Sequence, residues 1–265
     1  MHVINQSQIS SAWLEALTLL LQEGGKATHM VVAIGSPSAS EDERVRTALD
    51  TFIKERRESK TPIWPVSTVA NTIFPAAFYR PDSPSARARL YELHAKAQAL
   101  HKRLRNPDNY FDRLVAYPSV EGDPFNQLEY IVDRLINQRK PRKGGRGGAL
   151  TSPYEVGLNI PGGDLRIQAP GRDRNTMGFP CMSHVSFTLD GDLLNLSALY
   201  RNQHFVSRAY GNYVGLSRLG KFIAREVGIQ LGEVVCLATH ADAEIDTFGK
   251  GNVETLIRDA SGKAI

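Results

Sequence analysis

The sequence predicts an α+β, or mixed α/β, fold. Segments with helical and strand-like apolar spacing interleave along the 265 residues, and no internal repeat interrupts them. The turn letters "DGD" separate two apolar strand-like runs, which is a hairpin signal and excludes an all-parallel sheet. With 42% hydrophobic and 23% charged residues, the chain is typical of a globular protein that buries a full core, and we expect one domain over 1–265.

The first half begins with an amphipathic pattern at 8–23, where Ser10 or Ser11 is a candidate helix cap and glycines 24–25 a stop. A buried strand is expected at 28–35. The next helix has acidic residues at its start and mostly basic residues near its end, as the helix dipole favours. Including that helix, the further elements expected in this half are helices at 41–58, 85–104 and within 123–138, and a strand at 61–69.

The second half is more regular. The runs "HVSFTLD" and "LLNLSALYR" are the hairpin strands. A helix is expected at about 209–227 and should end at Gly228. Along it, three glycines would allow close packing of the backbone: Gly211, Gly215 and Gly220. The segment 233–245 then begins as a buried strand.

The segment 139–148, "RKPRKGGRGG", differs in composition from the rest of the chain. It has five basic residues and four glycines in ten positions. A solvated flexible loop is the preferred interpretation, and a phosphate-binding arm is the alternative. The net charge of +4 suits anionic ligands but is low for a dedicated duplex-DNA binder. Two cysteines do not make a disulfide framework, and the N-terminus has neither a signal-peptide pattern nor a membrane-length apolar run, so we expect a cytoplasmic protein.

Cys181 lies just after a proline at the mouth of the hairpin. If the hairpin loop has three residues, Cys181 lies opposite Arg201, with Cβ atoms ~5 Å apart. A two-residue loop would put the two side chains on opposite faces, and the sequence leaves both open. A neighbouring guanidinium would favour a reactive thiolate. From the residues alone, a buried packing cysteine is preferred to a nucleophile.

Several motifs, however, resemble the thymidylate synthase family, which includes the deoxycytidylate hydroxymethylases. Pro180-Cys181 opens the hairpin, Arg201 follows twenty residues later, Asn212 eleven after that, and "LGE" at 231–233 matches an apolar-Gly-acid signature. Upstream, "YFDRLVAYP" and "FNQLEYIVDRLIN" resemble two consecutive family segments. The resemblance is best over 110–138 and 177–233. It implies a large mixed sheet packed by helices and a homodimer formed through the sheet.

The resemblance implies a role for each matched residue. Cys181 would be the nucleophile that adds to C6 of a pyrimidine, Arg201 would bind the nucleotide phosphate, and Asn212 would read the uracil edge. The implied reaction adds a one-carbon unit to C5 of dUMP or a related pyrimidine nucleotide monophosphate. The implied donor is 5,10-methylenetetrahydrofolate. An asparagine near a helix start is also often only a cap.

The sequence departs from the family at the sugar and phosphate positions. "RNQH" stands where the family has Arg-Ser-x-Asp, which puts Asn202 at the phosphate-binding serine and His204 at the aspartate. The family's His and Tyr, which hold the sugar hydroxyl, correspond to Asp242 and Glu244 without a gap. With a two-residue shift, His240 takes the histidine position. A ribonucleotide or a modified nucleotide is therefore an alternative substrate.

Two further family features match weakly. Glu92 is the best candidate for the general base, and an exposed helical glutamate is the competing interpretation. Arg142 and Arg146 occupy the region of the paired arginines that reach the partner subunit's phosphate site. The stretch from Arg146 to Cys181 is longer than in the family, and no N-terminal Arg-Thr-Gly-Thr-Gly loop or folate-covering tail is evident.

The polar alternation at 240–246 would place four side chains on one strand face. A solvated face explains this pattern better than a divalent-metal site, and we predict no metal. Three functions follow in order of preference. The first is a thymidylate-synthase-like transferase. The second is a diverged nucleotide-binding member without folate chemistry, with a regulatory or scaffold role. The third is nucleic-acid binding through 139–148, for which no aromatic stacking platform is evident.

Overall fold

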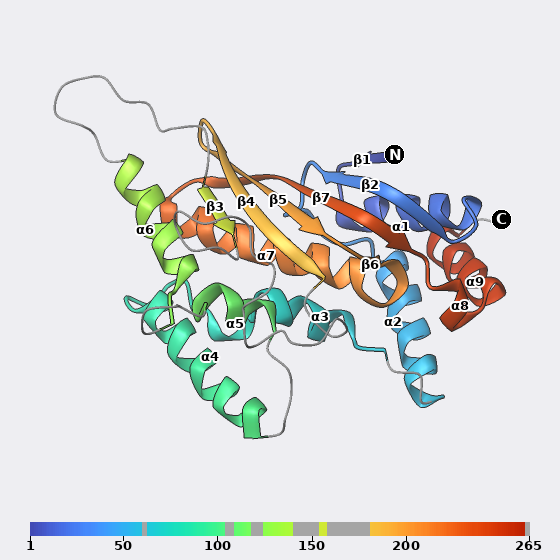
Figure 1. The fold of residues 1–265 in the computed structure, drawn as a ribbon, viewed down its shortest axis with the longest axis horizontal. Coiled ribbons are helices and arrows are strands. Elements are labelled where there is room, and N and C mark those ends of the chain that lie inside the picture. The colour runs from blue at the N-terminus through green and yellow to red at the C-terminus, as the bar shows by residue number, and fades with distance from the viewer. Residues whose placement is uncertain (60–62, 104–108, 118–123, 140–153, 158–180, 263–265) are drawn as a thin grey trace.

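In the computed structural model, a mixed sheet lies above a layered set of helices (Figure 1). The structure describes residues 1–59, 63–103, 109–117, 124–139, 154–157 and 181–262. Within these residues seven strands form one sheet in the order β1-β2-β7-β5-β4-β3, and β6 pairs with β7. The strands are β1 His2–Gln6, β2 Lys26–Ile34, β3 Tyr154–Gly157, β4 Met182–Asp190, β5 Leu193–Tyr200, β6 Gln203–His204 and β7 Gln230–Asp242.

The sheet combines both strand directions, as the hairpin predicted. The pairs β1–β2, β5–β7 and β6–β7 are parallel, whereas β2–β7, β3–β4 and β4–β5 are antiparallel. Burial alternates along the central strands, so one face of the sheet is covered. The expected mixed α+β class is confirmed.

The helices form successive layers below the sheet (Figure 1). Helix α7 packs on β7 and β5, α3 packs on α7, and α5 packs on both α3 and α6. The helices are α1 Ile9–Gln22, α2 Glu43–Glu58, α3 Val66–Ile73, α4 Ala86–Arg103, α5 Tyr110–Val115, α6 Gln127–Arg139, α7 Tyr210–Val227, α8 Ile245–Phe248 and α9 Lys250–Ser261, with short turns η1 Ala76–Phe78 and η2 Phe205–Ala209. Among the described residues, no helix is long and apolar enough to cross a membrane.

The strand expected at 61–69 is wrong, because Val66–Ile73 forms helix α3. The β-branched residues suggested a strand, yet the buried side chains are Val66, Val69, Ala70 and Ile73. Their separations of three, four and seven residues are those of one helix face. Pro65 precedes the helix, where the backbone N–H is not needed for a hydrogen bond within the helix, so proline is tolerated there. Residues 60–62 lie outside the described residues.

Ser10 does not cap the first helix. The N-cap of α1 is Gln8, and Ser10 lies inside the helix, where it is buried. Its hydroxyl pairs with the Tyr210 hydroxyl at 2.9 Å and accepts the N–H of Asp42, also at 2.9 Å. Because Asp42 caps α2 and Tyr210 begins α7, this one hydroxyl joins three helices.

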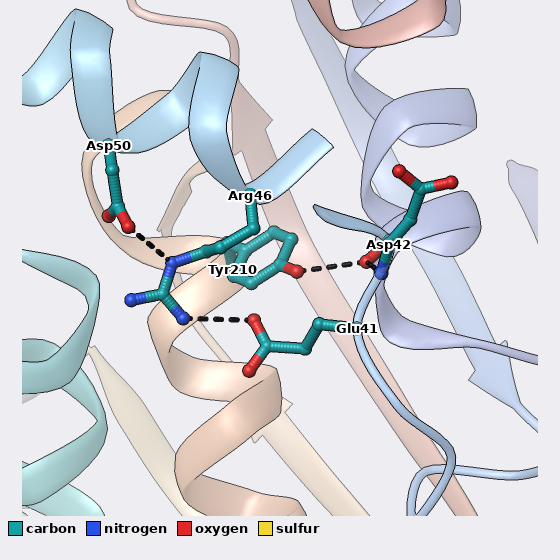
Figure 2. Close-up of polar contacts among 6 residues, drawn as sticks. Glu41, Asp42, Arg46, Asp50 and Tyr210 are labelled. Carbon is teal, nitrogen blue, oxygen red and sulfur yellow. Dashed lines mark hydrogen bonds and ion pairs between the residues drawn. The ribbon is translucent and has the colours of Figure 1, made fainter. Parts of the chain in front are cut away.

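Figure 2 shows the polar cluster around this contact. Arg46 lies between Glu41 and Asp50 and forms ion pairs with them at 3.0 and 2.8 Å. The ring of Tyr210 lies beside the arginine stem, and burial raises the pKa of its hydroxyl. The cluster fixes the first turn of α7, which also carries Asn212.

Close packing between α7 and α3 depends on two glycines. A Cβ at Gly211 would come within 2.5 Å of Val69 Cβ, and one at Gly215 within 2.9 Å of the Ala70 carbonyl oxygen. Gly228 ends α7 in the left-handed conformation with φ of 76°. The predicted close packing at Gly211 and Gly215 and the predicted helix end at Gly228 are confirmed.

Candidate active site

A bulge in the hairpin brings Cys181 opposite Arg201. The loop has two residues, because Asp190 pairs with Leu193. If this register continued unbroken along the hairpin, the side chains of Cys181 and Arg201 would lie on opposite faces of the sheet. The register shifts by one residue between Met182 and His184, so that Met182 pairs with Tyr200. The N–H of Arg201 then donates to the Cys181 carbonyl oxygen at 2.9 Å.

Tyr110 lies close to Cys181, and Arg208 acts on Tyr110. The Tyr110 hydroxyl accepts the N–H of Met182 at 3.1 Å. Burial raises the pKa of Tyr110 to about 12, and the Cys181 thiol also raises it while the Arg208 guanidinium lowers it. A group that stays protonated and hydrogen-bonding at neutral pH therefore adjoins the half-buried thiol. Sequence analysis missed both residues as site residues, although Tyr110 begins the quoted segment "YFDRLVAYP".

The second cysteine has the opposite environment. Cys236 is fully buried in the middle of β7, and burial raises the pKa of its thiol. Burial of this kind makes a thiol unreactive. Of the two cysteines, only Cys181 is partly accessible.

Asn212 lies in the first turn of α7 and is 5% exposed. It is not the cap of this helix, because the π-helical turn η2 at Phe205–Ala209 leads directly into α7. The interpretation as a simple cap is therefore wrong. A buried amide in this position is available for a specific polar contact.

A polar chain runs from Asn202 through His204 to Glu244. The Asn202 amide nitrogen lies 3.2 Å from His204 Nε2, and His204 Nδ1 lies 3.7 Å from a carboxylate oxygen of Glu244. Ser207 donates to that carboxylate twice, from its N–H at 2.7 Å and from its hydroxyl at 2.6 Å. Burial raises the pKa of Glu244, and the bonds from Ser207 and the charge of His204 oppose this.

The polar face expected at 240–246 ends at Glu244. His240 and Asp242 belong to β7, but Glu244 follows the strand in a left-handed conformation with φ of 59°. Its carboxylate turns inward to Ser207, and its N–H donates to the Asp242 carboxylate at 2.7 Å. In the described part of the chain, no group of three or more acidic, histidine or cysteine side chains is arranged to hold a metal ion.

The other predicted residues lie apart or outside the description. Glu92 lies on α4 with its side chain 62% exposed, and its carboxylate pairs with Lys96 at 2.6 Å. This ion pair lowers the pKa of Glu92. Arg142, Arg146 and the rest of the basic segment beyond Arg139 lie outside the described residues.

Comparison with known proteins identifies two relatives, and no family model matches the chain. A protein of Methanocaldococcus jannaschii named "Putative thymidylate synthase" is 25% identical over 146 residues, 54% of this chain and 59% of the relative. One of Methanococcoides burtonii with the same name is 26% identical over 140 residues, 53% of this chain and 49% of the relative. Over about half of its length, this chain is therefore similar to proteins named as thymidylate synthases, in agreement with the resemblance of its motifs. It spans about half the length of the curated relatives that it matches.

The mixed sheet packed by helices is consistent with the thymidylate-synthase-like fold that the motifs implied. The structure also brings Cys181 and Arg201 together across the hairpin mouth. The roles assigned to the individual site residues remain predictions of the resemblance.

Proposed function

We propose that this thymidylate-synthase-like protein adds a methyl or hydroxymethyl group to C5 of a pyrimidine nucleotide, dUMP or a relative. The pairing of Cys181 with Arg201 is the observation that carries the proposal. It sets the backbones of a partly accessible cysteine and an arginine opposite each other, and this placement supports a nucleophile next to a phosphate-binding guanidinium. The names of the two relatives support the same reaction class.

In the proposed reaction the Cys181 thiolate attacks C6 of the ring, and the electron pair of the C5–C6 bond moves toward C5 and the C4 carbonyl. C5 would then act as the nucleophile toward the one-carbon donor. Loss of the C5 proton to a base and departure of the Cys181 thiolate from C6 would restore the C5–C6 double bond. Arg201 holds the phosphate, and the Asn212 amide offers a donor and an acceptor to the O4 and N3–H edge of uracil. Tyr110, protonated at neutral pH, is placed to hydrogen-bond near the reacting sulfur.

The resemblance implies 5,10-methylenetetrahydrofolate as the donor of the one-carbon unit. The C-terminal helix α9 packs against α2 and α1. Glu92 remains the proposed general base only by resemblance, since its carboxylate is exposed and pairs with Lys96.

A homodimer formed through the sheet is part of the proposal. The face of the sheet away from the helices carries half-exposed apolar side chains on three neighbouring strands: Val31, Ala33, Leu199, Val235 and Leu237. Apolar side chains gathered on an open face favour burial against a second copy.

The test compares Cys181→Ala with Cys236→Ala in the full chain. Both variants remove one thiol, but only the first removes the partly accessible thiol. With dUMP and methylenetetrahydrofolate, we expect Cys181→Ala to form no product above background while still binding dUMP. Cys236→Ala should keep its activity. A Cys181→Ala protein that turns over at the wild-type rate would rule out the proposed role.

The inward turn of Glu244 favours a second candidate, nucleotide binding without folate chemistry. This residue stands where the family holds the sugar, yet its carboxylate is engaged by Ser207. Calorimetry with a panel of pyrimidine nucleotides, with and without folate, separates the two functions. Folate-dependent binding supports the transferase, and nucleotide binding that folate leaves unchanged supports the second candidate.

A further inference from the structure

The buried carboxylate of Asp112 joins helices α4 and α5. His94 and Gln98 lie one turn apart on one face of α4, and both side chains donate to this carboxylate, His94 from Nε2 at 2.5 Å. The backbone N–H of Asn109 donates to the same carboxylate at 2.8 Å. His94, Gln98 and Asp112 are each at most 8% exposed. Donors from two segments of the chain therefore hold one carboxylate away from water.

This arrangement exceeds what a helix start requires. Asn109 and Asp112 form a capping box at the start of α5, in which the N–H of Asp112 donates to the Asn109 side chain at 2.9 Å. A capping box is complete with two residues, whereas here two more side chains bond from another helix. The His94 ring also lies edge-on to Phe111, with ring centroids 4.6 Å apart. Because apolar packing is often as stable as a buried charged group, retained groups of this kind fix one arrangement in some proteins.

The arrangement that is fixed includes the position of Tyr110. Helix α5 has six residues, Tyr110–Val115, and a helix of this length is not stable without tertiary contacts. The hydroxyl of Tyr110 accepts the N–H of Met182, the residue after Cys181, at 3.1 Å. An O–H that accepts in this way still has its own hydrogen to donate. Since Asp112 lies in the same turn as Tyr110, a shift of α5 against α4 also moves this hydroxyl.

We propose that His94, Gln98 and Asp112 are positioning residues, which hold the Tyr110 hydroxyl beside Cys181 and thereby set the rate of the reaction from a second helix. The inference rests on the proposed function. Misplacement by about 1 Å can lower a catalysed rate by about a hundredfold. Loss of the bonds from α4 should therefore lower kcat. It should leave KM for dUMP nearly unchanged, because other residues are proposed to bind the nucleotide.

The test removes the two donors on α4 and keeps the shapes of the side chains. His94→Phe keeps a ring against Phe111, and Gln98→Met keeps a side chain of similar length. With dUMP and methylenetetrahydrofolate, the variant with both changes should have kcat about tenfold to a hundredfold lower, as should Tyr110→Phe. KM for dUMP should stay within about twofold of wild type. Gln98→Met alone should give the same change to a smaller extent.

The control is Val253→Ala, which removes buried methyl groups from α9. This helix packs on α1 and α2 and lies at the other end of the molecule from α4 (Figure 1). The variant should lose stability but keep kcat and KM.

A double-mutant cycle separates positioning from a general loss of stability. In a Tyr110→Phe protein, the two changes on α4 should lower kcat by at most about a further twofold, because the group that they position is already absent. Equal losses of kcat with and without the Tyr110 hydroxyl would overturn the inference.

Hydrogen exchange at the Met182 amide gives a measurement that needs no turnover. By NMR, this amide should exchange about tenfold faster in the α4 variant and in Tyr110→Phe, relative to other amides of β4. Val253→Ala should leave that ratio unchanged. A ratio unchanged by the α4 substitutions would overturn the inference and leave the proposed function standing. The expected exchange, in a protein whose wild type does not turn over dUMP, would support the positioning and count against the proposed function.

Discussion

The contact between α7 and α3 predicts that Gly215→Ala destabilises the protein, although alanine favours helices. A Cβ at this position would lie 2.9 Å from both the Ala70 carbonyl oxygen and Ile73 Cβ. Neither atom is the end of a flexible side chain, because one belongs to the backbone and the other is a branch point. The two helices must therefore move apart.

The size of the effect follows from two opposing contributions. Overpacking a tight interface costs ~1–3 kcal/mol of stability. Because the new Cβ would contact two rigid atoms, we expect a cost of about 3 kcal/mol here. Alanine recovers about 1 kcal/mol of helix propensity. The expected net loss in the free energy of unfolding is about 2 kcal/mol. Asn212 lies one turn earlier in α7, so the same movement should weaken nucleotide binding.

Gly251→Ala is the matched control. Gly251 is also helical, in α9, but a Cβ there would have no atom within 4 Å. This variant should gain ~0.5–1 kcal/mol, because alanine restricts the unfolded chain more than glycine does. Urea unfolding followed by circular dichroism measures both variants. A Gly215→Ala protein as stable as wild type, beside a stabilised control, would refute the reasoning.

Three further substitutions test other contacts. Ser10→Ala leaves two partners of the buried hydroxyl unpaired and should lower the free energy of unfolding by ~1–3 kcal/mol in thermal melts. Gln203→Met should raise the melting temperature, because neither polar atom of this buried amide has a partner among the described residues, and a lower value would contradict this. Burial raises the pKa of Glu244 in the folded protein above its value in the unfolded chain. The folded protein therefore binds this proton more tightly, and its stability falls as pH rises between the two pKa values. Glu244→Gln should therefore be the more stable protein at neutral pH, with the difference vanishing below about pH 4, as denaturation at several pH values will show.

Apolar spacing predicted the elements that bury one clear face. The hairpin strands, the long helix ending at Gly228 and the helices at 41–58 and 85–104 appear within a few residues of their expected bounds. Each has many apolar residues at one period, so local and tertiary preferences agree. The 61–69 segment failed because side-chain type suggested a strand whereas spacing fitted a helix.

Elements without such a pattern were not found. Strand β1 at His2–Gln6 has only one buried residue, Ile4. It is an edge strand defined by its parallel pairing with β2, a long-range contact with no local signature. Ser10 shows the same limitation, since its hydroxyl serves Tyr210, two hundred residues away, and not its own helix end.

The site depends on a feature that hairpin arithmetic alone does not give. A two-residue loop should have separated Cys181 from Arg201, and the observed loop does have two residues. The bulge at Ser183 inserts one residue on β4 and so restores the pairing of Cys181 with Arg201. The Ser183 hydroxyl donates to the Leu199 carbonyl oxygen at 3.1 Å. A regular hairpin would satisfy the backbone equally well, so local stability does not explain the bulge. What it changes is the face to which Cys181 belongs, and bulges next to active sites commonly redirect a side chain in this way.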